Sequence, residues 1–127
     1  MINRKKLLNR IILFILFIFV LNFLAMKFYW YSSIWWFDMP MHLLGGFWIG
    51  ITLIWFLSLK NLSLKNVIIV ILGVLLVGIG WEIFEISVDK IVTGNVFNVL
   101  DTMSDICFDL SGGFLSMFYF LKRIMVK

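Results

Sequence analysis

Four long apolar runs leave this sequence few folds that it can adopt. They cover about residues 11–31, 41–59, 67–86 and 101–121, in a chain that is 63% hydrophobic. A helix of roughly 20 apolar residues crosses a hydrocarbon layer of about 30 Å, so each run is long enough to span a bilayer. We therefore expect an all-α fold, in which residues 1–127 form a single integral membrane domain, a polytopic bundle of four transmembrane helices.

The basic residues indicate how this bundle is oriented. Nine of the eleven lysines and arginines fall on one side of a four-span bundle: Arg4, Lys5, Lys6, Arg10, Lys60, Lys65, Lys122, Arg123 and Lys127. Lys27 and Lys90 fall on the other side. Because positively charged loops stay in the cytoplasm, we expect both termini there, in a multi-pass protein of the cell (plasma) membrane. Topology explains the net charge of +4, so the expected partner is the lipid bilayer and not nucleic acid.

The seven acidic residues all fall in the outer part of this arrangement, and Asp89 belongs to the loop after the third run. The others, with one histidine, form three groups spaced by three or four residues: Asp38 with His42, Glu82 with Glu85, and Asp101 with Asp105 and Asp109. Such spacing places side chains on one face of a helix. A charge within a membrane segment costs about 2.5–3.5 kcal/mol, so these groups require water, partners, protons or a cation.

The depths of these groups predict that they meet. At a rise of about 1.5 Å per residue, they lie at similar distances below the outer surface in the second, third and fourth runs. We expect one shallow pocket there, with a cation held by carboxylate ligands from Glu82, Glu85, Asp105 and Asp109. His42, oriented by Asp38, is the candidate catalytic acid or base. A single histidine among carboxylates favours Mg²⁺, Mn²⁺ or Ca²⁺ over structural zinc.

Simpler structural roles compete with this interpretation. Asp38 and Asp101 stand where helices begin, so each is also placed to cap a helix. The glutamates and the deeper aspartates are also compatible with a solvated interfacial surface. Gly46 and Gly50 form a Gly-x-x-x-Gly pair, which predicts close packing against another helix.

The motifs Asp38-x-x-x-His42, Glu82-x-x-Glu85 and Asp101-x-x-x-Asp105-x-x-x-Asp109-x-x-Gly112 resemble those of the VanZ-like superfamily and its relatives, the small bacterial membrane proteins of YjdF type. Trp81-Glu82-Ile-Phe-Glu85 and Asp101-Thr-x-x-Asp105 are more similar to the YjdF-type branch. The resemblance covers residues 38–113 and implies an all-helical membrane fold with an outward-facing polar site.

Two classes of function follow. One is a membrane-embedded enzyme that carries out metal-assisted chemistry on a lipid or cell-envelope precursor. The alternative is a non-enzymatic protein that binds or transports an ion, a proton or a lipid headgroup. The inner halves of the second and third runs are almost purely apolar, which disfavours a pathway through the membrane.

Overall fold

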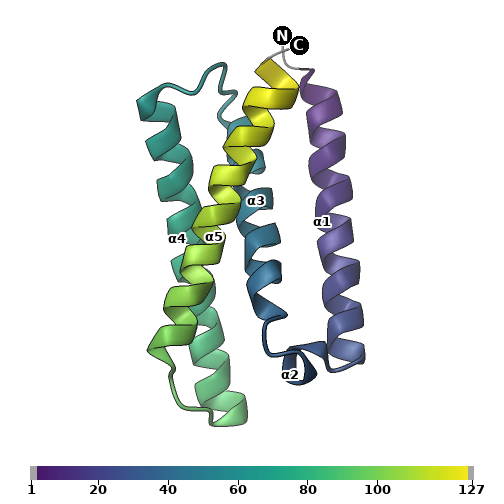
Figure 1. Ribbon diagram of the computed structural model, residues 1–127, viewed down its shortest axis with the longest axis vertical. Helices are drawn as coiled ribbons and strands as arrows, with labels where there is room; N and C mark the ends of the chain where they lie inside the picture. Colours follow the sequence, from purple (N-terminus) through teal and green to yellow (C-terminus); the bar gives the residue numbers. More distant parts are fainter. Residues whose placement is uncertain (1–2, 126–127) are drawn as a thin grey trace.

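The computed structural model describes residues 3–125, and these residues fold into helices joined by short turns. Four long helices run alternately up and down the molecule (Figure 1): α1 (Arg4–Lys27), α3 (Asp38–Phe56), α4 (Leu64–Val88) and α5 (Val99–Phe120). A short helix, α2 (Trp30–Ser33), lies in the connection between α1 and α3. Single π-helical turns, η1 (Asp89–Thr93) and η2 (Leu121–Met125), extend α4 and α5. The expected all-α class is confirmed.

Short polar side chains cap three of the long helices. Asn3 and Ser63 accept hydrogen bonds from backbone N–H groups in the first turns of α1 and α4. Asn98 does the same for α5, where its Oδ1 lies 3.3 Å from the backbone nitrogen of Asp101. The expectation that Asp38 and Asp101 cap their helices is wrong: Asn98 caps α5, and α3 has no side-chain cap. Both carboxylates are therefore free to make other contacts.

The helices extend beyond or stop short of the apolar runs. α1 covers the basic residues before the first run and ends at Lys27, whereas the run continues to residue 31. α4 and its η1 turn continue to Thr93, well past the expected end near residue 86. Hydropathy marks where apolar residues stop, but a helix continues until its hydrogen bonding is interrupted. Here the interruption comes at Gly94, whose φ of 68° suits a residue without a side chain.

Three helices are long and apolar enough to cross a membrane: α1, α3, and α4 together with η1. Their outward faces carry exposed large apolar side chains such as Phe19, Phe56 and Leu76. Exposing such apolar surfaces to water would be unfavourable, whereas in a bilayer they would contact lipid tails that are equally apolar. α5 is of similar length but carries three aspartates, so its role as a fourth span stays a prediction.

Glycines allow α3 and α5 to pack closely. Gly46 and Gly50 of α3 are buried. A methyl group on Gly46 would collide with the backbone of Asp109, and one on Gly50 with the side chain of Ser116. Close helix contact at Gly46 and Gly50 is thus confirmed, and α5 is the partner helix.

The apolar core fills the half of the bundle where α3 ends, α4 begins and α5 ends. Its buried members come from α1, α3, α4 and α5 and from Leu59 in the turn after α3: Leu7, Ile11, Ile51, Ile54, Leu59, Val70, Val74, Met117 and Phe120. The buried ionisable groups, His42, Glu82, Asp105 and Asp109, lie in the other half.

Candidate functional site

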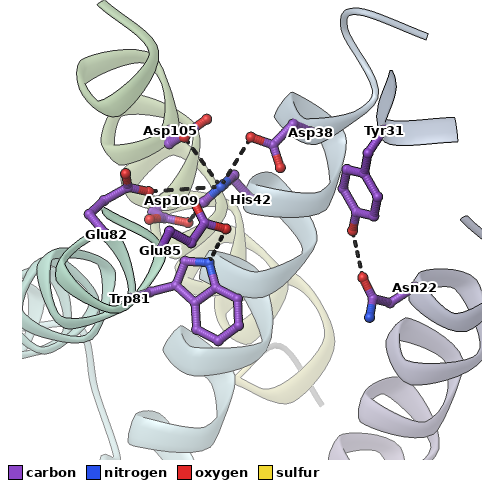
Figure 2. A network of polar contacts seen from close by, with 9 residues as sticks. All are labelled: Asn22, Tyr31, Asp38, His42, Trp81, Glu82, Glu85, Asp105 and Asp109. Carbon is purple, nitrogen blue, oxygen red and sulfur yellow. Dashed lines mark hydrogen bonds and ion pairs between the residues drawn. The ribbon is translucent and has the colours of Figure 1, made fainter. Parts of the chain in front are cut away.

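The polar half of the bundle is where α3 begins, α4 ends and α5 begins (Figure 1). Side chains from these three helices converge there on the imidazole of His42, as Figure 2 shows. We call this group the acidic cluster; its members are Asp38, His42, Glu82, Glu85, Asp105 and Asp109. The structure therefore brings together all six site residues that the sequence predicted.

His42 lies at the centre of the acidic cluster. Its Nδ1 is 3.0 Å from Oδ1 of Asp109, which is a hydrogen bond. Its Nε2 is 3.5 Å from Oδ2 of Asp38 and 3.5 Å from Oδ2 of Asp105. Oε1 of Glu82 lies 3.9 Å from the same nitrogen. One ring nitrogen is therefore firmly bonded, and the other faces three carboxylates at longer range.

Asp109, and not Asp38, fixes the orientation of the imidazole. A carboxylate only accepts hydrogen bonds, so the Nδ1–H group of His42 donates to Asp109. The contact with Asp38 is too long for a strong hydrogen bond. This arrangement directs Nε2 toward the carboxylates of α4 and α5 and toward Asp38. The sequence could not show which aspartate bonds to His42. Asp38 shares a helix face with His42, and Asp109 lies at a similar depth on another helix.

Three carboxylate oxygens in the cluster are buried and find no hydrogen-bond partner among residues 3–125: Glu82 Oε1, Asp105 Oδ2 and Asp109 Oδ2. The residues that carry them are 4%, 1% and 5% exposed. A buried polar group without a partner costs about 1–3 kcal/mol, and more if it is charged. Such groups are rare in native proteins, and each requires an explanation.

The charges of the cluster are not balanced by basic side chains. Within the part of the chain that the structure describes, every ion pair of these carboxylates is with His42, and none is with lysine or arginine. A protonated imidazole supplies one positive charge against five carboxylates. Protons or a bound cation must therefore offset the remainder if these groups are to stay buried.

Four residues could hold a metal ion directly: His42, Glu82, Glu85 and Asp105. Each offers one ligand atom, and the four atoms lie within 4.8 Å of one another. Oε1 of Glu85 accepts a hydrogen bond of 2.8 Å from the indole Nε1 of Trp81, one helical turn earlier in α4. The indole therefore restrains this carboxylate near the imidazole.

Asp109 occupies a different position from these four. Its Oδ2 faces Gly78 of α4, where an added methyl carbon would lie 2.7 Å from this oxygen. Its backbone lies against Gly46 of α3. Asp109 is thus held between two glycines, with one oxygen on His42, which suits a residue that positions the imidazole.

Sequence reasoning did not identify the contributions of Trp81 and Gly78. Trp81 precedes Glu85 by four residues, so the helical spacing that paired the acidic residues also pairs the indole with this carboxylate. Gly78 precedes Glu82 by four residues on the same buried face of α4. No sequence pattern shows that the partner of Gly78 is an aspartate of another helix.

Tyr31, in α2, lies at the border of the cluster (Figure 2). Its hydroxyl donates a hydrogen bond of 2.6 Å to Oδ1 of Asn22 on α1. Burial raises the pKa of this hydroxyl to about 12, and the nearby carboxylates of Asp38 and Glu85 add to the rise. Tyr31, in the connection between α1 and α3, is therefore close enough to the acidic cluster for the negative charge there to raise its pKa.

Fold and site together define a small helical membrane protein with a buried histidine surrounded by carboxylates. The chain belongs to the family described as "Predicted membrane protein (DUF2238)", whose model matches residues 2–125. No curated protein and no solved structure matches the chain.

Proposed function

We propose that the acidic cluster binds a divalent cation, Mg²⁺, Mn²⁺ or Ca²⁺, through His42, Glu82, Glu85 and Asp105. The observation that carries this proposal is the set of buried carboxylate oxygens without partners around the imidazole. A cation would supply the missing partner for Glu82 and Asp105 and would offset their charge. Asp109, which the sequence suggested as a fourth carboxylate ligand, instead positions His42.

The distances around Nε2 support a shared ion better than hydrogen bonding. Separations of 3.5 and 3.9 Å between nitrogen and oxygen are long for hydrogen bonds. Two neighbouring ligands at about 2.4 Å from Ca²⁺ lie roughly 3.4–3.9 Å apart, whereas at about 2.1 Å from an octahedral Mg²⁺ they lie roughly 3.0 Å apart, so Mg²⁺ would require the ligands to draw closer. The observed spacing falls in the range for Ca²⁺.

The protein would use this cation for metal-assisted chemistry on a lipid or cell-envelope precursor. A cation held by His42, Glu82, Glu85 and Asp105 would supply Lewis-acid polarisation of a carbonyl or phosphoryl oxygen. Of the four carboxylates around His42, Asp38 is the most exposed, with 34% of its side chain accessible. Asp38 is therefore the best placed to meet a substrate and to accept a proton. His42, the other catalytic candidate from the sequence, would instead act as a ligand, with Nδ1 bonded to Asp109 and Nε2 directed at the cation.

The topology expected from the sequence is part of the proposal. Four spans with both termini in the cytoplasm place the acidic cluster at the outer face of the cell membrane. The resemblance to VanZ-like and YjdF-type proteins supports the same placement. Reporter fusions at Lys65 should report cytoplasm, and fusions at Thr93 the outside. A cytoplasmic Thr93 would contradict this topology.

Melting of the Asp105→Asn variant tests the metal site. Asparagine keeps the shape of Asp105 but lacks its charge. If a cation holds the cluster, stabilisation of the purified protein by added Mg²⁺ or Mn²⁺ should shrink in the variant. If the carboxylates are merely tolerated, the variant should be more stable than the wild type, and neither should respond to ions. Asp89→Asn, an exposed change outside the cluster, is the matched control.

One observation favours a non-enzymatic alternative. Each ring nitrogen of His42 lies within 3.5 Å of a carboxylate oxygen, so neither is free to face a substrate. The cluster would then hold an ion or a cationic headgroup without reaction. Lipid profiles of cells that express the wild type or Asp38→Asn separate the two functions. If the purified wild type binds Mn²⁺ but the lipid profiles of the two kinds of cell are identical, the non-enzymatic alternative is supported.

A further inference from the structure

Asp105 belongs to two groups of possible metal ligands. The first is the buried group already described, with His42, Glu82 and Glu85. The second contains Asp38, Asp101 and Asp105, whose ligand atoms also lie within 4.8 Å of one another. We infer that the site holds two divalent cations that share the carboxylate of Asp105. This inference rests on the proposed function, because it adds an outer cation to the inner one.

The outer group is assembled by helix geometry. Asp101 and Asp105 are one turn apart on α5, so their carboxylates share a face. Asp38 lies in the first turn of α3, which packs against α5. Neither Asp38 nor Asp101 caps its helix, since Asn98 fills that role in α5 and no side chain does in α3. Both carboxylates are left for an ion.

Asp105 is the residue that links the two positions. It is only 1% exposed, and its Oδ2 has no hydrogen-bond partner. Its Oδ2 lies 3.5 Å from Nε2 of His42, so Asp105 would bind the inner cation through this oxygen and the outer cation through Oδ1. Carboxylates that bridge cations about 3.5–4 Å apart are a feature of two-metal sites.

The charge of the combined site favours two cations over one. The two groups contain five different carboxylates, and Asp109 beside them is the sixth. In the described part of the chain, His42 is the single residue paired with them that can carry a positive charge. With a neutral imidazole ligand, one divalent ion would leave four negative charges and a second would leave two. The second ion therefore removes repulsion that the first does not.

The ligands of the two positions differ in how exposed they are. In the inner group His42, Glu82 and Asp105 are buried, whereas in the outer group Asp101 is exposed and Asp38 partly so. The inner ion is therefore sequestered, and the outer ion is exchangeable and in contact with the surface. We expect the inner site to fill at lower metal concentration than the outer one.

Binding of Mn²⁺ to the full chain in phosphatidylcholine nanodiscs tests this inference, because this lipid carries no net charge that would collect the metal. The wild type should bind two Mn²⁺ per chain, and its electron paramagnetic resonance spectrum should show two coupled ions. The Asp101→Asn variant should bind one Mn²⁺, with the spectrum of an uncoupled ion. Its affinity should equal that of the tighter of the two sites in the wild type. Asp89→Asn, an exposed acidic residue outside both groups, should behave as the wild type.

The possible results separate the two proposals. One uncoupled Mn²⁺ in the wild type, unchanged by Asp101→Asn, would overturn the outer site and leave the proposed function intact. Two uncoupled ions would overturn the bridging role of Asp105. No Mn²⁺ bound to the wild type would overturn the proposed function itself.

Discussion

Replacing Gly46 by alanine should loosen both the fold and the site. A methyl carbon on Gly46 would lie 2.7 Å from the carbonyl carbon of Asp109 and 2.8 Å from its Cα. Ordinary contacts between carbon atoms are about 3.5–4 Å, so α5 must move away from α3 by roughly 1 Å. Backbone atoms cannot turn aside as a flexible side chain can. We expect a loss of about 1–3 kcal/mol in the free energy of unfolding, as for other overpacked interiors.

The same displacement should weaken metal binding. Asp109 carries the oxygen that lies 3.0 Å from Nδ1 of His42. A shift of about 1 Å takes this pair beyond hydrogen-bond distance, and the imidazole loses its orientation. Loss of such a supporting contact typically costs about 10–100-fold in metal affinity. The melting temperature should fall by several degrees, and Mn²⁺ should bind more weakly.

The neighbouring residue provides a matched control. An added methyl group on Gly45 would meet no atom within 4 Å. Gly45→Ala should therefore be neutral, or more stable by up to about 1 kcal/mol, because alanine favours helix over glycine. Both variants are melted in the same detergent, with and without Mn²⁺. Equal effects of the two substitutions would refute the packing argument.

Three further changes probe individual contacts. Trp81→Phe removes the donor to Glu85, and Asp109→Asn removes the charged acceptor of His42; Mn²⁺ titrations should show about 10–100-fold weaker binding in each. Unchanged affinity would exclude these supporting roles. Tyr31 ionises near its ordinary pKa of 10.0 when unfolded and near 12 when folded. Its contribution to stability is thus present below pH 10 and lost as the pH rises toward 12. In melts across this window Tyr31→Phe should lose less stability than the wild type, and parallel curves would contradict this.

The sequence predicted the helices from their apolar runs, and it predicted the meeting of the acidic residues from helical spacing and from their similar depths in the membrane. Apolar runs locate membrane helices, and a separation of four residues places Asp105 and Asp109 on one face whatever the helix packs against. The Gly46 and Gly50 pair likewise predicted a close helix contact. These inferences need no knowledge of the rest of the fold.

Partners across helices were beyond such reasoning. Spacing shows that Asp38 and Asp109 both approach His42, but the rotation of α3 against α5 decides which of them bonds to Nδ1. The backbone contact between Gly46 and Asp109 fixes that rotation. The cap of α5 was misjudged for a local reason: Asn98 stands three residues before Asp101, in the position that a helix cap requires.

The arrangement of α5 explains how a helix with three aspartates can lie in a membrane. Its buried face holds Asp105 and Asp109 together with small residues, which allow α3 and α4 to cover the carboxylates. Its exposed side carries apolar side chains, such as Phe114, Leu115 and Phe118. Lipid would therefore meet apolar surface, and the cost of the buried charges would fall on the interior of the bundle, where a cation can offset it. By this reasoning the expected fourth span and the proposed metal site depend on each other.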